Sequence, residues 1–449
     1  MAPVTVQAPA FEADPVEAFW APGRDVGLSL LSDPGAAWTS VKGGTIRAVG
    51  LSDHAEINQR WFDERLRVAE RFMASSVVEF ATAPALATDV SIRQNTLAVN
   101  GKWLLAGPAG DRMIAHCQHA WRKADKRPFW GKRLRAHLED APSGMPQVTG
   151  EDVRDVPFVI EAKNLKNYYH FTKEVLAALT ALDAVPGHRA SIKIVYQKHP
   201  PAPFVPRFIE ALFPELAARV EYVEAPQSFP KAILCWYGDY AELQGPRSGH
   251  WGARHAFETT PTGAGISMIL RHCGYARALR LLRERAFRAI EGQDFSHLPR
   301  RFWVTRIGGH DRAPRMEAAI IAAFAERGFQ TLAFEELSPL EQIAAMARAQ
   351  AMASYHGAGF TNMMYAARAA KVIELGTLQT GIQRVGDFSA FAHVSGCDYT
   401  HAAADFDHTG PEVIPPLRGN GLYPVRISDA GIARLMSHVD GLLGPVAKD

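Results

Sequence analysis

One stretch near the C-terminal end constrains the fold more than any other, residues 351–376, with the sequence AMASYHGAGFTNMMYAARAAKVIELG. Its pattern predicts a short strand over 351–355, a His-Gly-Ala-Gly turn, a helix of about two turns and a second strand over 371–375. A glycine turn that leads into a helix presents unpaired backbone N–H groups and the positive end of the helix dipole to one point. Such a point suits a phosphate or diphosphate group. The stretch therefore predicts a nucleotide-binding element in an α/β fold.

Several residues of this stretch are candidates to bind the same ligand. The glycines of the turn leave room for an anion to approach the backbone. The histidine is expected at the strand end, where open α/β sheets place their ligands. A threonine and an asparagine can add side-chain donors from the first helical turn, and a glutamate at the end of the second strand can accept from a ribose diol. The candidate donor-site residues of the stretch are His356, Gly357, Ala358, Gly359, Thr361, Asn362 and Glu374.

Strands that alternate with helices surround this element. One series begins at Pro157 with a strand, a helix over 167–183 and a strand over 190–197, and a second series begins at Arg301. This order predicts mostly parallel sheets and two Rossmann-like domains that face a central cleft, which fits a chain of 449 residues. We expect a mixed α+β N-terminal extension over 1–150, Rossmann-like domains over 151–296 and 297–400, and a tail over 401–449. The tail ends in a closing helix, 427–444, for which a return to the first domain is left open.

Two local signals are specific enough to be checked. Asn100-Gly101, between apolar runs, is the favoured pair for a tight hairpin turn. Ser338, Pro339 and Glu341 form the pattern of a capped helix start.

Composition excludes several classes of protein. The net charge of +2 gives no global attraction to nucleic acid. The four cysteines form no C-x-x-C pair, which argues against a zinc ribbon or disulfide framework and for a reducing compartment. No apolar run approaches the ~20 residues needed to span a bilayer, and the first residues do not resemble a secretory signal. We therefore expect a cytoplasmic protein, with a place at the inner face of the plasma membrane left open.

Three further segments have two interpretations each. The segments 121–139 and 271–292 are rich in arginine and lysine, so each could contact an anionic glycan or membrane surface, or could simply be a solvated face. In the third segment, Asp405 and Asp407 form a D-x-D triplet, a motif that holds a divalent metal in some enzymes. Because the triplet lies in a polar loop far from the first βα unit, we predict no metal site there.

Candidate catalytic residues occur in both series. Arg306 ends the FWVTRI strand and Arg312 follows it, so both could stabilise charge on a leaving phosphate. His170 and Glu174 are four residues apart on one helical face, and either could take a proton from an acceptor hydroxyl. The alternative is a histidine that bonds to the backbone beside a solvated glutamate.

The ordered motifs resemble those of glycosyltransferase family 61. The resemblance covers residues 157–376 and rests on NYYHF (167–171), Arg306, Arg312, HGAGFTN (356–362) and VIEL (372–375). It implies a GT-B fold, an inverting transfer from a nucleotide sugar, and no obligatory metal or other cofactor. Met316 departs from the family, which commonly has asparagine there, and Glu174 stands where aspartate is usual.

The sequence therefore predicts an inverting hexosyl- or pentosyltransferase of bacterial capsular or surface polysaccharide synthesis. The expected partners are a nucleotide sugar and an oligo- or polysaccharide acceptor, with lipid linkage and peripheral membrane contact left open. Asn167 and Tyr168 are the candidate acceptor-binding residues. Two alternatives remain: a nucleotide-sugar epimerase of similar two-lobed fold, and a non-catalytic scaffold that binds glycan or membrane.

Overall fold

The computed structural model describes residues 19–21, 24–36, 38–72, 77–93, 96–113, 147–148, 150–239, 272–307, 316–419 and 421–444. These residues form a mixed α/β structure. The chain divides into two compact units, and each is built from segments far apart in the sequence. Unit 1 comprises residues 1–41, 78–270 and 274–285, and unit 2 comprises residues 42–77, 271–273 and 286–449.

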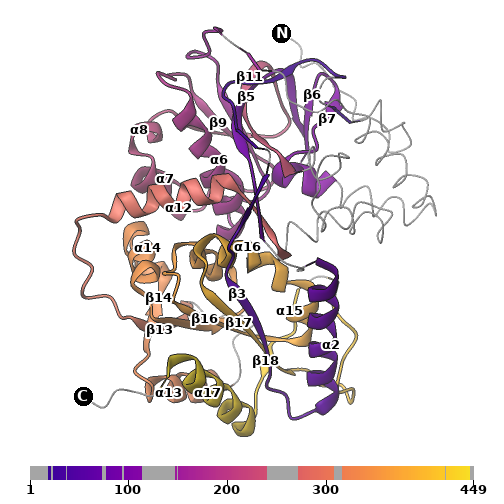
Figure 1. Cartoon of the computed structure of the whole chain (residues 1–449), viewed down its shortest axis with the longest axis vertical. Helices are drawn as coiled ribbons and strands as arrows, with labels where there is room; N and C mark the ends of the chain where they lie inside the picture. The colour runs from indigo at the N-terminus through magenta and orange to yellow at the C-terminus, as the bar shows by residue number, and fades with distance from the viewer. Residues whose placement is uncertain are drawn as a thin grey trace, which may run out of the picture. The chain divides into compact units, whose positions relative to one another are not determined.

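The main sheet of unit 1 has a parallel half and an antiparallel half (Figure 1). β8, β9 and β10 are parallel neighbours, and β11 runs parallel to β8 on its other side. From β11 onward the pairing with β5, β6 and β7 is antiparallel. In spatial order the described strands are β10 (Val220–Glu224), β9 (Ile192–Tyr196), β8 (Phe158–Ala162), β11 (Gln227–Tyr237), β5 (Thr82–Arg93), β6 (Thr96–Val99) and β7 (Lys102–Trp103), with β1 (Leu28–Leu30) beside β5.

The antiparallel half corrects the expected N-terminal extension. β5 pairs with β11 along ten positions, from Gln227↔Ile92 to Tyr237↔Thr82, so these early strands belong to the same sheet as β8 and β9. The physical reason is that β11 would otherwise leave a long unpaired edge. Within this half the predicted hairpin is confirmed: Asn100 and Gly101 both have positive φ, 47° and 75°, and join β6 to β7.

The described helices of unit 1 follow the parallel strands. After β8 the chain forms one continuous helical segment made of α5 (Tyr168–His170), a π-helical turn (Phe171–Leu176), α6 (Ala177–Leu179) and a 3₁₀ turn (Thr180–Ala184). α7 (Phe204–Leu212) and α8 (Pro214–Ala217) follow β9. A small sheet contains, in spatial order, β12 (Gly274–Ala276), β4 (Val77–Phe80) and β2 (Trp38–Val41). β12 leads directly into α12 (Arg277–Ile290), and the boundary between the two units falls within this helix.

The sheet of unit 2 is parallel apart from β18, which is antiparallel to its neighbour (Figure 1). In spatial order its described strands are β14 (Gln330–Ala333), β13 (Arg301–Thr305), β15 (Ala351–Tyr355), β16 (Lys371–Thr377), β17 (Asp398–Phe406) and β18 (Val425–Arg426), with β3 (Thr45–Gly50) parallel to β17. The tail expected over 401–449 therefore begins inside a buried strand, β17.

The helices of unit 2 alternate with these strands. Ser338 caps α14 and Glu341 completes the capping box, as predicted. Within the described residues, no helix is both long enough and apolar enough to cross a membrane. The helical segments are α2 (Ala55–Phe72), α13 (Glu317–Ala325), a 3₁₀ turn (Phe334–Glu336), α14 (Pro339–Arg348), a 3₁₀ segment (Ala358–Tyr365), α15 (Leu378–Gln383), α16 (Val385–Ser395) and α17 (Asp429–Leu443).

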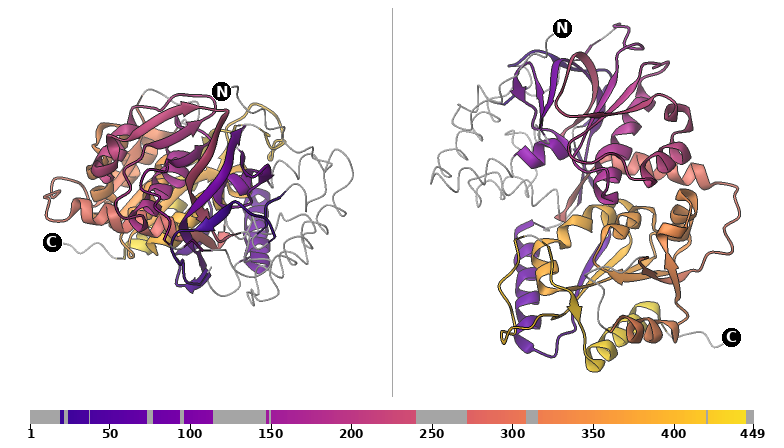
Figure 2. Two further views of the ribbon diagram at one scale, coloured as in Figure 1. Left: turned by 90° about the horizontal axis from the view of Figure 1, so that it is seen from above. Right: turned by 180° about the vertical axis from the view of Figure 1, so that it is seen from behind.

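Two of these helices correct the expected domain organisation. α17 does not return to unit 1, because its buried Leu435 and Val439 pack with Ile320 and Phe324 of α13 in the core of unit 2. α2, from the expected N-terminal extension, also belongs to unit 2, where Figure 2 shows it beside the later helices. Its Trp61 is fully buried in a second cluster with residues of α15 and β17.

Candidate functional site

The strand order of unit 2 creates a switch point between β13 and β15. From β13 the chain moves to β14 on one side and then to β15 on the other side, so connections leave the two central strands in opposite directions. In open parallel sheets, ligands bind beyond the carboxyl ends of such strands. Arg306 directly follows β13 and His356 directly follows β15. The structure thus brings together two of the predicted donor-site residues.

Arg306 lies directly on Gly357. Its Nη2 donates a hydrogen bond to the carbonyl oxygen of His356 at 3.1 Å, and its guanidinium lies 5.2 Å from the ring centroid of Tyr355. A Cβ atom at position 357 would lie 1.4 Å from Nη2. The backbone of Gly357 is extended, with φ of 177°, so its conformation does not require glycine. Glycine is required there because the arginine occupies the space of a side chain.

His356 contacts a buried carboxylate. Its Nδ1 forms a short hydrogen bond with Oε1 of Glu374, and the hydroxyl of Tyr399 donates to Oε2 of the same group. His401 lies on the same side, with Nδ1 3.7 Å from Oε2. Burial alone would raise the pKa of Glu374, but the charge and hydrogen bond of His356 outweigh it and hold the pKa well below its usual range. Glu374 therefore fixes the orientation of the His356 ring.

This geometry corrects the role expected for Glu374. The side chain has no exposed surface, so it cannot reach a ribose diol. The sequence suggested a strand that ends near Leu375, but β16 continues to Thr377. Glu374 is consequently an interior position, paired with Ser354 of β15 and with His401 of β17.

The helix predicted after the glycine turn is present over Ala358–Tyr365 and is of the 3₁₀ type. Thr361 and Asn362 are fully or almost fully buried, so their side chains do not face a ligand as expected. Asn362 Nδ2 donates to Gln342 Oε1 at 3.2 Å, which ties the segment to α14. Ala358 and Gly359 are half-buried. His356 is half-buried as well, so these three residues are the partly accessible positions of the turn.

A second polar cluster lies beyond the carboxyl end of β8 in unit 1. His170 Nδ1 is 2.8 Å from Glu174 Oε1, and the His170 side chain is 20% exposed. Glu174 also accepts from Arg112 Nη1 at 2.7 Å and from the backbone N–H of Lys163 at 3.0 Å. Burial would raise the pKa of Glu174, but Arg112 and His170 outweigh it and lower the pKa to about 2. The alternative of a solvated glutamate beside a backbone-bonded histidine is wrong.

The helical turn that carries Glu174 is a π-helix, which the 3.6-residue periodicity of the sequence could not predict. The N–H of Ala177 bonds to the carbonyl of Thr172, five residues back. Such turns are frequent at functional sites. Ala178, four residues after Glu174, lines the pocket described below together with it.

The two candidate acceptor-binding residues have structural roles. The Asn167 side chain accepts a hydrogen bond from the N–H of Tyr169 at 3.0 Å and so caps the helix. The ring of Tyr168 packs against Phe204 and Phe208 of α7, with centroid distances of 5.7 and 5.1 Å. Both residues position the helix that carries His170.

Other predicted features fall elsewhere. Arg312 and the basic segment 121–139 lie outside the described residues. Asp405 is buried at the end of β17 and accepts a hydrogen bond from Ser52. Three of the five arginines of α12 are engaged in ion pairs: Arg277 and Arg280 with Glu79, and Arg285 with Asp183 and Glu215.

Three residues of these clusters had no signal in the sequence: Arg112, Glu161 and Tyr399. Arg112 reaches Glu174 from 62 positions away, and its Nη2 donates to Glu161. Tyr399 lies in an ordinary buried strand. Their polar roles depend on strand pairing across long sequence separations, which a single sequence does not reveal.

Comparison with known proteins adds one finding. The family model described as Glycosyltransferase 61 matches residues 168–373, a range that includes His170, Arg306 and His356. No curated protein matches the chain. The family match agrees with the order of motifs in the sequence, and residues 168–373 are similar to glycosyltransferase family 61.

Proposed function

We propose that the protein is an inverting glycosyltransferase that moves a sugar from a nucleotide-sugar donor to a hydroxyl group of a glycan acceptor. The observation that carries the proposal is the His170–Glu174 pair, a partly exposed imidazole held by a buried carboxylate. Together with the family match, this pair supports general-base catalysis in unit 1 and donor binding in unit 2. The proposal includes the GT-B fold that the family resemblance implies.

His170 is the proposed base. Glu174 has a pKa of about 2 and is paired with Arg112, so it is a poor proton acceptor at neutral pH. It accepts from Nδ1–H of His170, which leaves the lone pair of Nε2 to take the proton of the acceptor hydroxyl. The acceptor oxygen then bonds to the anomeric carbon as the bond from that carbon to the phosphate oxygen breaks, with inversion of configuration.

Unit 2 is the proposed donor site. The diphosphate docks beside the backbone of Ala358 and Gly359, and Arg306 stabilises the charge on the departing nucleoside diphosphate. Arg312 is expected to assist. Glu374 acts through His356, whose other ring nitrogen is turned away from the carboxylate. This charge stabilisation by arginine requires no metal ion, in agreement with what the family resemblance implies.

The biological setting is part of the proposal. The family resemblance favours synthesis of bacterial capsular or surface polysaccharide, in the cytoplasm or at the inner face of the plasma membrane. The ion pairs of the α12 arginines give no support to the alternative of a membrane-binding scaffold.

The test begins with a thermal-shift screen of nucleotide sugars, because a ligand that binds the folded state raises the melting temperature. With the donor identified, His170→Ala and Arg306→Ala should each lower the transfer rate at least ~100-fold. Two matched substitutions serve as controls: His297→Ala, at an exposed histidine, and Arg301→Ala, at the opposite end of β13.

NMR of the product should show the inverted anomeric configuration. Full activity of the His170→Ala variant would show that His170 is not the catalytic base. Conversion of the nucleotide sugar without any acceptor would instead indicate an epimerase.

A further inference from the structure

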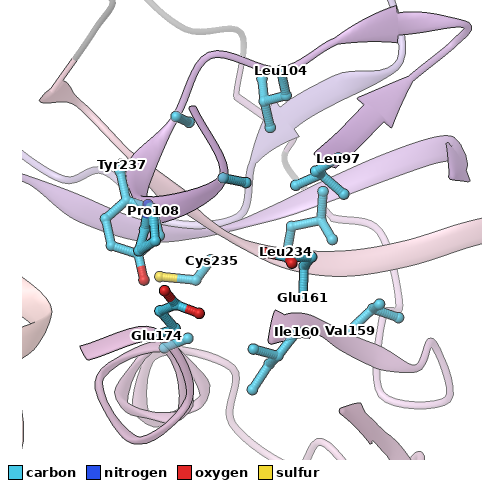
Figure 3. A pocket seen from close by; sticks show the side chains of 13 residues that line it. Leu97, Leu104, Pro108, Val159, Ile160, Glu161, Glu174, Leu234, Cys235 and Tyr237 are labelled. Carbon is cyan, nitrogen blue, oxygen red and sulfur yellow. The ribbon is translucent and has the colours of Figure 1, made fainter. Parts of the chain in front are cut away.

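A pocket in unit 1 lies at the switch point of its own sheet (Figure 3). β8 leads to β9 and β10 on one side, and β11 lies on its other side, so the carboxyl ends of β8 and β11 flank a crevice of the kind that binds ligands. The lining is mostly apolar and comes from β6, β8, β11 and residues 104–109. Its polar members are Glu161, Glu174, Cys235 and Tyr237.

Glu161 is the unexplained member of this lining. Its side chain is only 4% exposed, and Arg112 Nη2 donates to its Oε2. The other oxygen, Oε1, is buried and has no hydrogen-bond partner among the described residues. A buried carboxylate oxygen without a donor is costly, and native structures rarely leave one unpaired. The structure therefore contains an acceptor atom that a bound ligand can satisfy.

Hydrogen bonds link the lining of the pocket to the proposed base. Arg112 donates to Glu161 and also to Glu174, and Glu174 in turn contacts His170. Glu161 is thus connected to the imidazole through one arginine and one carboxylate. A ligand group bound at Glu161 would occupy the same crevice as the acceptor hydroxyl that His170 is proposed to deprotonate.

We infer that this pocket is an acceptor subsite, in which Oε1 of Glu161 accepts a hydrogen bond from a second hydroxyl group of the acceptor. The inference rests on the proposed function and adds the chemical class of the acceptor. The carboxylates of Glu161 and Glu174 would repel an anionic group. Arg112 donates to both carboxylates, so its charge is already balanced by them. The acceptor is therefore a neutral glycan with apolar carbons, which lie against Leu97, Leu104 and Leu234.

A neutral alkyl glycoside provides a test that does not require the donor. We expect octyl glucoside, below its micelle concentration, to bind the full chain in ligand-observed NMR, and octyl sulfate, with the same alkyl chain, not to bind. Glu161→Gln should weaken binding by about 10-fold. Arg112 would donate to the amide oxygen of the glutamine, so the amide N–H₂ would replace the acceptor oxygen that faces the pocket. Ala109→Leu should abolish binding by filling the pocket. Glu221→Gln, at an exposed ion pair of the same sheet, should change nothing.

With the donor identified, Glu161→Gln should raise KM for the acceptor about 10-fold and leave KM for the donor unchanged. An effect on kcat alone would overturn the inference, because it would indicate that Glu161 acts only by positioning Arg112. Equal binding of the glucoside by wild type and Glu161→Gln, or no binding by wild type, would also overturn it. Selective binding without sugar transfer from any donor would support the subsite as a glycan site and overturn the proposed function instead.

Discussion

At the scale of single residues, the contact between Arg306 and Gly357 gives the sharpest prediction. A methyl group at position 357 would occupy the place of the Arg306 Nη2 atom, while the extended backbone accepts alanine without strain. Gly357→Ala should therefore displace the guanidinium and lower activity to about the level of Arg306→Ala, with little change in melting temperature. The double variant should be no worse than either single one, because both changes remove one interaction.

Kinetics and thermal melts of the three variants check this expectation. Gly419→Ala is the matched control, since a Cβ there would meet no atom of the described residues within 4 Å. Additive losses in the double variant would show that Gly357 contributes independently of Arg306.

The residues that could be predicted are those whose role is set by local sequence. Arg306 and His356 follow from strands that end beside them, and the His170–Glu174 contact follows from their spacing of four. The burial of Glu374 could not be predicted, because the sequence around a carboxylate in an apolar run is the same whether the residue ends a strand or lies inside a buried one. Its burial is set by β15 and β17 on either side.

At the scale of elements, α12 is held to β4 by one carboxylate. Glu79 is buried, and it accepts from Arg277 Nε at 3.1 Å and from Arg280 Nε at 2.7 Å. Glu79→Ala leaves two arginines without this partner, so we expect the free energy of unfolding to fall by about 2–3 kcal/mol. Glu284→Ala removes only an exposed pair with Arg280 and should cost less than about 1 kcal/mol.

Urea unfolding of the two variants measures this difference. Equal losses would mean that the buried pair contributes no more than the exposed one. The basic character of α12 was visible in the sequence, whereas its partner lies 198 positions earlier, and for this reason the choice between ion pairs and a membrane surface stayed open.

The same limit applies to larger elements. Hydrophobic patterns predicted parallel strands in both units, among them β8, β9, β15 and β16, but not β3 or β17. Turn and capping residues predicted the Asn100-Gly101 hairpin and the start of α14. The patterns did not reveal that β5 pairs with β11, since a strand pattern does not name its partner. The π-helical turn was missed for a related reason, because one extra residue in a turn leaves the apolar pattern almost unchanged.

At the scale of the whole molecule, the interleaved segments determine which fragments can fold. Unit 2 takes β3 and α2 from residues 42–77, far from the rest of the unit in sequence. Without them, β17 loses one of its two parallel neighbours, and Trp61 is missing from the cluster that contains Leu378 and Phe406. We therefore expect residues 286–449 alone to lack cooperative unfolding, because a large apolar surface and a sheet edge remain uncovered.

Joining residues 42–77 to this fragment through a long Gly/Ser linker should restore a cooperative urea transition, followed by circular dichroism. The same fusion with Trp61→Asp is the matched control and should fail, since the indole is fully buried beside Gly381 and no aspartate partner is provided there. Cooperative unfolding of the shorter fragment by itself would show that unit 2 does not require β3 and α2 in order to fold. The expected outcome would instead make residues 42–77 an integral part of the unit that is proposed to bind the donor.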